Sequence, residues 1–427
     1  MAFPPYHIHH LYLNQQQAMP SLSPAEEGHY LVFWWEELPL GHVFIEPGQK
    51  ISEKEYYKKL AAAIAPAVEQ YAKKRGMEAA AKRWSLALQK GDVAGSTALL
   101  SVILNPELLQ GQPAEVPVSV IICTRNRASS LNHCLESLHR MAYRPQEIIV
   151  VDNAPADAST ENIVKKHQGV IYCMEPTPGL SFARNTGIKK AKAPFIAFTD
   201  DDVSVHPHWV YRVWQGFEQT GAAAFTGLVI ANELDTEAQL IFEKHWSFNR
   251  GYVDKLYNEQ YFNDTLAIGP PVWEIGAGAN AAFQKAIFEK IGYFDERLGA
   301  GASGCSEDSE LWYRILAKGY SICYTPRAVV YHGHRNSLEA LHRQLFSYMK
   351  GFTAAALIQQ EQYPQARYKK HLFRALPKYY FFLILRGFPN YRFRHKTLWS
   401  EIRGVCSGLL FYLKNRRKPS FSKNTAQ

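Results

Sequence analysis

The sequence predicts an α/β protein built on a mixed, mainly parallel sheet with helices on both faces, preceded by a small N-terminal α+β region and followed by a C-terminal helical region. Two observations predict this class. Between residues 118 and 199, near-continuous apolar runs alternate with segments of helical periodicity, which is typical of buried parallel strands joined by crossover helices. Polar side chains also follow the ends of three of the apolar runs. Because ligands of open α/β sheets bind at the carboxyl ends of the strands, we expect a site there.

Length and composition describe an ordinary folded protein with room for more than one domain. The 427 residues are 47% hydrophobic and 20% charged, which does not fit a disordered chain. The six cysteines lie far apart in the sequence, so a reducing compartment fits better than a disulfide scaffold. The N-terminus lacks the layout of a secretory signal, and the apolar stretches are too short or too interrupted for a spanning helix of roughly 18 residues. We therefore expect a cytoplasmic protein, either free or at the inner face of the membrane.

Proline-rich joints and changes of composition divide the chain into three regions. We expect an N-terminal accessory region at 1–115, a catalytic domain at 116–337, and a basic helical region at 338–427. Residues 105–117 contain three prolines and are expected to form the first linker.

The accessory region is predicted to contain a β-hairpin and one helix. Residues 30–35 and 43–45 have the composition of paired strands, and residues 39–41 that of a turn. The helix follows because Ser52 and Glu55 have capping-box spacing and are succeeded by apolar residues at helical spacing. No chemistry is predicted for this region.

In the central region the strands and helices are expected to alternate. The predicted strands are residues 118–123, 147–151, 170–174 and 195–199. The predicted helices lie around residues 131–138, 182–192, 284–291 and 306–316.

Three consecutive aspartates, Asp200, Asp201 and Asp202, follow the last of these strands. Negative charge at the end of a buried strand is costly unless a cation is present. A hard divalent ion such as Mg²⁺ is usually held by one or two carboxylates together with substrate phosphates. The cluster therefore indicates a metal and a diphosphate-bearing substrate. The alternative is a solvated acidic loop that caps the next helix.

The other strand ends carry groups that can contact a nucleotide. Thr124, Arg125, Asn126 and Arg127 follow the first strand, and Asp152 follows the second. Since these ends meet at one edge of the sheet, the residues are expected to share one site with the aspartates.

These segments together resemble family 2 glycosyltransferases with the GT-A fold, which is Rossmann-like and whose members use nucleotide-sugar donors with inversion. The resemblance covers residues 118–337, about half of the chain. The matching motifs, in order, are VSVIICTRNR at 118–127, EIIVVDNAP at 147–155, PGLSFARNTGI at 178–188, FTDDDV at 198–203, GANAAFQKAIFEKIGYFDERLG at 278–299 and SEDSELWYRIL at 306–316.

The resemblance implies a donor site. By this match the first-strand loop and Asp152 hold the nucleobase, since a carboxylate accepts from a uracil N–H, and Arg184 meets the diphosphate or the base. Gly278 and Asn280 lie where the family binds the donor and acceptor sugars. The structural alternatives are a turn-forming aspartate, a surface arginine and a simple glycine turn.

The resemblance also implies a metal site and a catalytic base. Asp202 is the direct ligand of Mn²⁺ or Mg²⁺, Asp200 faces the ribose or the ion, and Asp201 only assists. His332 or His334 adds a ligand, His332 being the better positional match.

The acidic pair that follows is the second catalytic element. By the same match Asp308 is the general base and Glu307 binds the acceptor sugar. The alternative is that both carboxylates only complement the dipole of a helix that begins there.

The C-terminal region combines apolar and basic residues. Residues 379–385 are dense in aromatic and aliphatic side chains and have Lys and Arg on both sides. This pattern is typical of an interfacial helix on anionic lipid, or of a helical subdomain packed on the core with a solvated basic face.

The sequence as a whole predicts an inverting glycosyltransferase that moves a sugar from a nucleotide-diphosphate sugar, UDP-linked by resemblance, to a hydroxyl of a glycan or lipid-linked acceptor, as in cell-surface polysaccharide synthesis. The first alternative is a catalytically silent nucleotide- or sugar-binding protein on the same scaffold. A nucleic-acid-binding protein is suggested only by the basic tail, and no reading motif accompanies it, so no nucleic-acid partner is expected.

Overall fold

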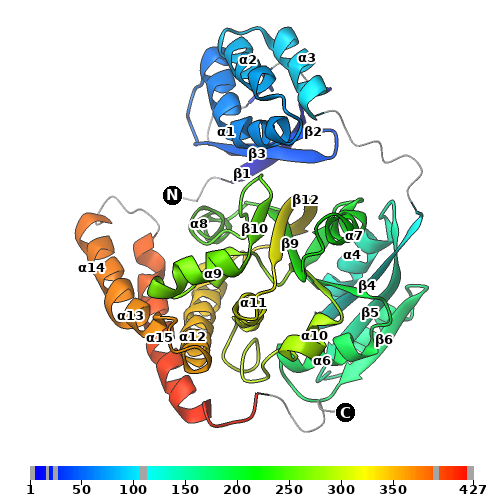
Figure 1. The fold of residues 1–427 in the computed structure, drawn as a ribbon, viewed down its shortest axis with the longest axis vertical. Coiled ribbons are helices and arrows are strands. Elements are labelled where there is room, and N and C mark those ends of the chain that lie inside the picture. Colours follow the sequence, from blue (N-terminus) through cyan, green and yellow to red (C-terminus); the bar gives the residue numbers. More distant parts are fainter. Residues whose placement is uncertain (1–4, 16–18, 23–26, 105–112, 388–393, 421–427) are drawn as a thin grey trace.

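The computed structural model describes residues 5–15, 19–22, 27–104, 113–387 and 394–420. A small N-terminal layer sits at one end of a large central sheet, and the C-terminal helices stand beside that sheet (Figure 1). The predicted linker at 105–117 lies partly outside the described residues, and its last residues belong to the first strand of the central sheet. The domain boundaries at 115 and 337 stay predictions.

The N-terminal sheet has three strands, one more than predicted. They are β1 Tyr6–Tyr12, β2 Gly28–Trp35 and β3 Leu38–Ile45. β1 pairs with β2 in parallel, and β2 pairs with β3 in the expected antiparallel hairpin. The predicted turn at 39–41 was wrong, because these residues lie inside β3 and the chain turns at Glu36, which has φ +49°. Position 41 requires glycine, because a Cβ at this position would come within 2.4 Å of the Ala63 carbonyl oxygen.

Three helices, rather than the single one predicted, cover this sheet. They are α1 Glu53–Lys74, α2 Glu78–Gln89 and α3 Val93–Leu104. Ser52 caps α1 by accepting from Glu55 N at 3.3 Å. Leu60 and Ile64 of α1 are buried in a core that continues into the central sheet through Leu228 and Val329. The N-terminal layer is therefore packed on the sheet through a shared core.

The central sheet is mixed and mainly parallel, as predicted. Its strands are β4 Glu115–Thr124, β5 Arg144–Asn153, β6 Val170–Glu175, β7 Phe195–Asp200, β8 Val203–Val205, β9 Ala224–Ala231, β10 Lys255–Tyr257, β11 Asn280–Gln284 and β12 Ile322–His332. The order is β10-β12-β9-β11-β7-β4-β5-β6, and the short β8 pairs with β12. Because β11 is antiparallel to both β7 and β9, and β12 is parallel to β9, six of the nine strands run in one direction.

Helices cover both faces of this sheet. They are α4 Ala128–His139, α5 Ser159–Val164, α6 Leu180–Lys190, α7 Trp209–Thr220, α8 Glu237–His245, α9 Glu259–Thr265, α10 Ile287–Ile291 and α11 Glu307–Ala317. Neighbouring residues of β4 face opposite cores: Ile121 packs in one cluster, and Val120 and Ile122 pack in the other. A sheet buried on both faces explains why its strands read as continuous apolar runs.

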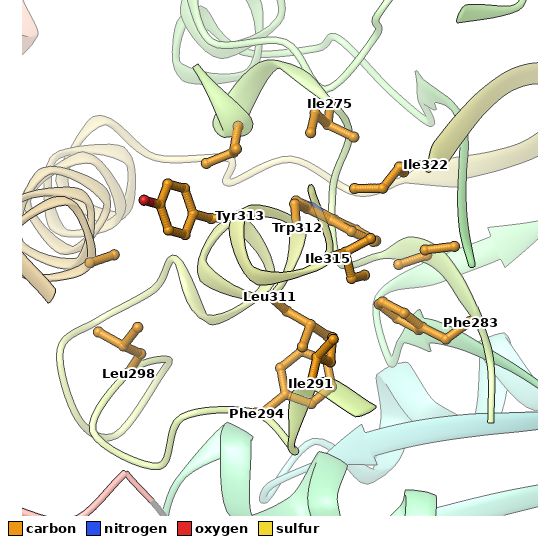
Figure 2. Close-up of a cluster of buried hydrophobic side chains, with 14 of the residues drawn as sticks. Ile275, Phe283, Ile291, Phe294, Leu298, Leu311, Trp312, Tyr313, Ile315 and Ile322 are labelled. Atoms are coloured by element: carbon orange, nitrogen blue, oxygen red, sulfur yellow. The ribbon is translucent and has the colours of Figure 1, made fainter. Parts of the chain in front are cut away.

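The helix predicted at 284–291 begins only at Ile287. Gln284 is the last residue of β11, whose Ala281 and Phe283 are buried between β7 and β9, and the next two residues form a turn. Figure 2 shows how α11 fits into the same core, with Leu311 and Trp312 directed toward the side chains of neighbouring elements. The Trp312 and Phe283 rings stack with centroids 5.0 Å apart. This packing fixes the position of α11, whose first turn carries Glu307 and Asp308.

The C-terminal region is helical, as predicted. It comprises α12 Leu338–Gln362, α13 Tyr368–Lys370, the π-helical turn η3 His371–Ala375, α14 Leu376–Gly387 and α15 Arg394–Asn415. α15 packs closely on α12, since a Cβ on Gly408 would lie 2.4 Å from the Lys350 carbonyl oxygen. Among the described residues, no helix is long and apolar enough to cross a membrane.

Candidate active site

A cavity of about 1330 Å³ opens at the carboxyl ends of the central strands. Most of the predicted site residues line it, namely Thr124, Arg125, Arg127, Arg184, Asp200, Asp201, Asp202, Gly278, Glu307, Asp308 and His332. These residues come from β4, α6, β7, α11, β12 and the loops that follow the strands. The topology thus brings together residues spread over more than 200 positions of the sequence, as the strand-end pattern predicts.

Asp200, Asp202 and His332 form a cluster, called the metal-fit cluster below. Each offers one ligand atom, and the three atoms lie within 4.8 Å of one another. The cause is the pairing of β8 with β12, which sets Val203 opposite His332 and so holds the preceding Asp202 beside the histidine. The two carboxylates suit Mn²⁺ or Mg²⁺, and the imidazole adds a nitrogen donor that favours Mn²⁺ over the oxygen-preferring Mg²⁺.

Asp201 does not belong to that cluster. Its Oδ2 accepts from Thr124 Oγ1 at 2.6 Å, and its Oδ1 pairs with Arg127 Nη1 at 2.5 Å. Burial raises the pKa of Asp201 to about 7, although Arg127 and Thr124 act in the opposite direction. Asp201 therefore anchors the first-strand loop, and the assisting role predicted for it stays a prediction.

Two arginines contact Asp202 as well. Arg127 Nη2 lies 2.8 Å and Arg335 Nη1 lies 3.4 Å from Asp202 Oδ2. Arg335 was missed in the sequence, because it is 133 residues from Asp202 and belongs to no motif. Guanidinium groups at this place suit the phosphates of a nucleotide.

His332 is buried and stands between Asp202 and a second histidine. Its Nε2 lies 3.6 Å from Asp202 Oδ1, and its Nδ1 lies 3.2 Å from His334 Nδ1. Burial lowers the pKa of His332 to about 4 despite the nearby Asp202, so the ring is neutral at pH 7 and can act as a ligand. His334 lies outside the metal-fit cluster and pairs with Glu243 Oε2 at 3.0 Å.

Arg184 and Glu307 form a buried ion pair in the cavity wall. Arg184 Nη1 lies 2.7 Å from Glu307 Oε1, and Arg184 Nη2 lies 3.8 Å from Asp200 Oδ1. Gly278 allows this arrangement, because a Cβ there would be 2.6 Å from Arg184 Nη2. Glu307 Oε2 is buried without a hydrogen-bond partner, and burial raises the pKa of Glu307 to about 7 against the effect of Arg184.

Asp308 is oriented by backbone donors. Its Oδ2 accepts from Gly278 N at 2.8 Å, and its Oδ1 accepts from Ser309 N at 2.7 Å. A carboxylate fixed in this way at the edge of a cavity can accept a proton from a bound hydroxyl.

Four predicted site residues make other contacts and do not line the cavity. Asn126 Oδ1 accepts from Ala156 N, and Asp152 Oδ2 accepts from Tyr172 Oη. Asp152 is fully buried and its Oδ1 has no hydrogen-bond partner. Asn280 bridges Trp209 Nε1 and the carbonyl oxygens of β9 and β12. His334, the fourth, lies behind His332.

Aromatic side chains line the cavity together with the charged residues. They are Trp246, Phe248, Trp273, Tyr348, Phe352, Tyr379 and Tyr380. The sequence marks only Tyr379 and Tyr380 among these, as part of the aromatic run 379–385, because the others come from loops and helices whose approach depends on the tertiary fold. Aromatic faces of this kind pack on sugar rings or apolar chains.

Comparisons with known proteins show similarity over the part of the chain that holds much of this site. Residues 119–292 match the family model described as glycosyl transferase family 2. The pre-mycofactocin glycosyltransferase of Mycobacterium tuberculosis is 26% identical over 250 residues, which cover 57% of this chain and 49% of that protein. The glucosyl-dolichyl phosphate glucuronosyltransferase of Haloferax volcanii is 21% identical over 189 residues, which cover 43% of this chain and 57% of that protein. The chain thus spans about half the length of these curated relatives.

Solved structures of TarS from S. aureus, residues 1–349, are also similar to this chain. One is 14% identical and has a TM-score of 0.38, covering 69% of this chain and 91% of that one. A second, in complex with UDP-GlcNAc, has 13% identity and the same TM-score.

Proposed function

Since the chain carries a glycosyl transferase family 2 domain, we propose that it is a glycosyltransferase that moves a sugar from a nucleotide-diphosphate sugar, with UDP as the nucleotide, to an acceptor hydroxyl. One observation carries the proposal. The metal-fit cluster and the carboxylate of Asp308 line the same cavity, so that one bound donor meets both. The loop with Thr124 and Arg125 lines the same cavity and is the proposed nucleoside end of the donor site. Asp152 pairs in register with Thr124 on the neighbouring strand, but it is buried and does not line the cavity.

Asp200, Asp202 and His332 would hold a divalent cation, Mn²⁺ or Mg²⁺. When bound, such an ion supplies Lewis-acid stabilisation of the negative charge that develops on a departing diphosphate. Arg127 and Arg335, which contact Asp202 Oδ2, lie where they can bind phosphate oxygens of the donor. Arg184 supplies a further buried positive charge between Asp200 and Glu307.

The proposed chemical step is a single displacement with inversion. An acceptor hydroxyl gives its proton to a carboxylate oxygen of Asp308 while its oxygen forms a bond to the anomeric carbon. The bond from that carbon to the phosphate oxygen breaks, and the nucleoside diphosphate leaves with the electron pair. The unpartnered Glu307 Oε2 is a ready acceptor for a hydroxyl of the acceptor sugar.

The acceptor side of the cavity is bordered by α14, which has an unusual distribution of apolar side chains. Tyr380 and Leu383 form its buried stripe, whereas Phe381, Ile384 and Leu385 are 57%, 53% and 61% exposed. A helix on a protein surface normally presents its polar face to solvent. The exposed apolar side chains of α14 therefore indicate contact with another apolar surface, either lipid or a protein.

Charge around α14 favours a lipid surface over a protein partner. Residues 362–400 contain nine Lys and Arg and no Asp or Glu, and Arg374 and Lys378 are exposed beside the apolar face. An apolar face with basic borders is how a helix lies on anionic lipid. We therefore propose peripheral contact with the inner face of the membrane, where the enzyme would glycosylate a lipid-linked or growing glycan acceptor, as in polysaccharide synthesis.

The membrane contact predicts a specific loss of vesicle binding. The double variant Phe381→Asp/Leu385→Asp should no longer sediment with vesicles that contain anionic lipid, because two charges replace the apolar contact. As a control, Leu86→Asp/Val102→Asp changes two exposed apolar residues of the N-terminal helices and should leave sedimentation unchanged. Wild-type protein that stays in the supernatant with anionic vesicles would contradict the proposed contact.

A catalytically silent nucleotide- or sugar-binding protein is the alternative function. A panel of nucleotide-sugars, tested by thermal unfolding with Mn²⁺, separates donors from non-ligands, since a ligand of the native state alone raises its stability. A transferase should then release nucleoside diphosphate from the stabilising donor when cell-derived glycolipid is added. A donor that stabilises the protein but is never turned over would favour the silent binding protein.

A further inference from the structure

A chain of three buried polar side chains, His332, His334 and Glu243, leads from the metal-fit cluster into the interior. His332 Nδ1 lies 3.2 Å from His334 Nδ1, and His334 Nε2 lies 3.0 Å from Glu243 Oε2. The three side chains are 7%, 1% and 3% exposed. Because they are buried, their polar atoms depend on one another for hydrogen bonds.

The order of donors and acceptors in this chain of side chains follows from the carboxylate at its end. An ionised carboxylate only accepts hydrogen bonds, so His334 Nε2 must carry a proton and donate it to Glu243. The Nδ1 of a neutral His334 then has a lone pair and accepts from His332 Nδ1. A neutral His332 that donates through Nδ1 has its lone pair on Nε2, which is the atom that faces Asp202.

The opposite tautomer of His332 would not serve a cation. With its proton on Nε2, the ring would donate toward Asp202 Oδ1, 3.6 Å away, and would offer no lone pair to the metal-fit cluster. The negative charge of Asp202 favours that tautomer. A second influence is therefore needed to hold the proton on Nδ1, and Glu243 acting through His334 supplies it.

We propose that Glu243 and His334 are positioning residues, which hold His332 in the tautomer whose Nε2 can bind a divalent cation. This inference rests on the proposed metal site. It gives His334 a part in the site although it lies outside the metal-fit cluster. Partners of this kind orient metal-binding imidazoles and raise their affinity for the ion.

The N-terminal region takes part in the same chain of side chains. Tyr30, on β2, is completely buried, and its hydroxyl donates to Glu243 Oε1 at 3.4 Å. Glu243 lies on α8, whose neighbour Phe242 packs its ring 4.7 Å from that of His334. The accessory region, to which the sequence assigns no chemistry, thus contacts the carboxylate that orients the metal ligand.

Two substitutions at position 334 test the proposal. In His334→Gln the carbonyl oxygen can accept from His332 Nδ1 and the amide can donate to Glu243, whereas His334→Leu fills similar space without either bond. Mn²⁺ affinity is measured from the electron paramagnetic resonance signal of the free ion, without nucleotide. Binding by the metal-fit cluster is defined as the part lost in Asp202→Asn, because Glu37, His206 and His208 form another group of potential ligands.

We expect His334→Leu to weaken Mn²⁺ binding by about 10–100-fold and His334→Gln to stay close to wild type. Tyr30→Phe should cause a smaller loss, and Tyr56→Phe, at a buried tyrosine of the same region, none. Thermal unfolding without metal checks that each variant is folded.

Equal affinities of wild type and folded His334→Leu would overturn the proposal while leaving the metal site intact. Equal losses in His334→Leu and His334→Gln would also overturn it, because they would indicate a packing role only. Failure of the wild-type protein to bind Mn²⁺ would overturn the metal site itself, and the proposal with it.

Discussion

Replacement of Asp308 by asparagine is expected to lower the rate of sugar transfer by about 10²–10⁴-fold, the usual contribution of a general base. The side chain keeps its size, but the amide cannot take the proton of the acceptor hydroxyl. The measurement is the steady-state release of nucleoside diphosphate at saturating donor and acceptor.

Nucleotide binding separates this loss from a folding defect. In the variant only one side-chain oxygen remains to accept a hydrogen bond, so either Gly278 N or Ser309 N loses its partner. This loss should cost about 1–3 kcal/mol of stability. The protein should therefore still fold, and its nucleotide affinity should change little. Asp264→Asn, at an exposed position on α9, is the matched control and should transfer sugar at the wild-type rate. Wild-type turnover by Asp308→Asn would refute the assignment of the base.

The second large effect is expected from Asp202→Asn. Mutation of a residue that only hydrogen-bonds to a metal ligand typically weakens metal binding by about 10–100-fold. Loss of a direct ligand should therefore weaken Mn²⁺ binding by at least that factor. Arg127 and Arg335 both contact the carboxylate of Asp202. In Asp202→Asn both guanidinium groups therefore lose a negatively charged partner. The free Mn²⁺ signal measures the affinity directly.

Asp201→Asn is the matched control, one residue away in the same acidic triplet. Because its carboxylate contacts Thr124 and Arg127, this variant should lose about 1–3 kcal/mol of stability and still bind Mn²⁺. If Asp201→Asn lost the ion and Asp202→Asn kept it, the metal ligands would be wrongly assigned.

The sequence predicts those parts of the fold and site that depend on local patterns. Apolar runs mark β4, β5 and β7 because these strands are buried on both faces, whereas the apolar run of β6 belongs to a half-buried edge strand. Asp200 and Asp202 follow from charge placed at a strand end. Ser52 caps α1 as its spacing with Glu55 predicts. In each case the physical cause acts over a few residues.

Other parts depend on segments that are distant in the sequence. β11 was not predicted, because the short segment becomes a strand only through its place between β7 and β9. Asn280 resembles a sugar-binding residue of the family, but its side chain bridges Trp209 to β9 and β12. Glu243 is 91 residues from its partner His334, and Arg335 is 133 residues from its partner Asp202. No local sequence pattern marks either residue.

The sequence leaves two readings of the C-terminal region open, a packed helical subdomain and an interfacial helix. α12 and α15 pack closely on each other, as a helical subdomain would. α14 keeps a mainly apolar outer face, as an interfacial helix would. Packing of the region is therefore observed, whereas contact of α14 with lipid stays a proposal. Leu376 and Tyr379 of α14 line the cavity.

The most direct test of a metal-dependent nucleotide-sugar site is the affinity of the wild-type protein for UDP, measured by calorimetry with and without Mn²⁺. Because the phosphates would share the ion with Asp200, Asp202 and His332, UDP should bind much more tightly with Mn²⁺, and the difference should disappear in Asp202→Asn. Equal UDP affinities with and without Mn²⁺ in the wild-type protein would contradict the metal role of the cluster.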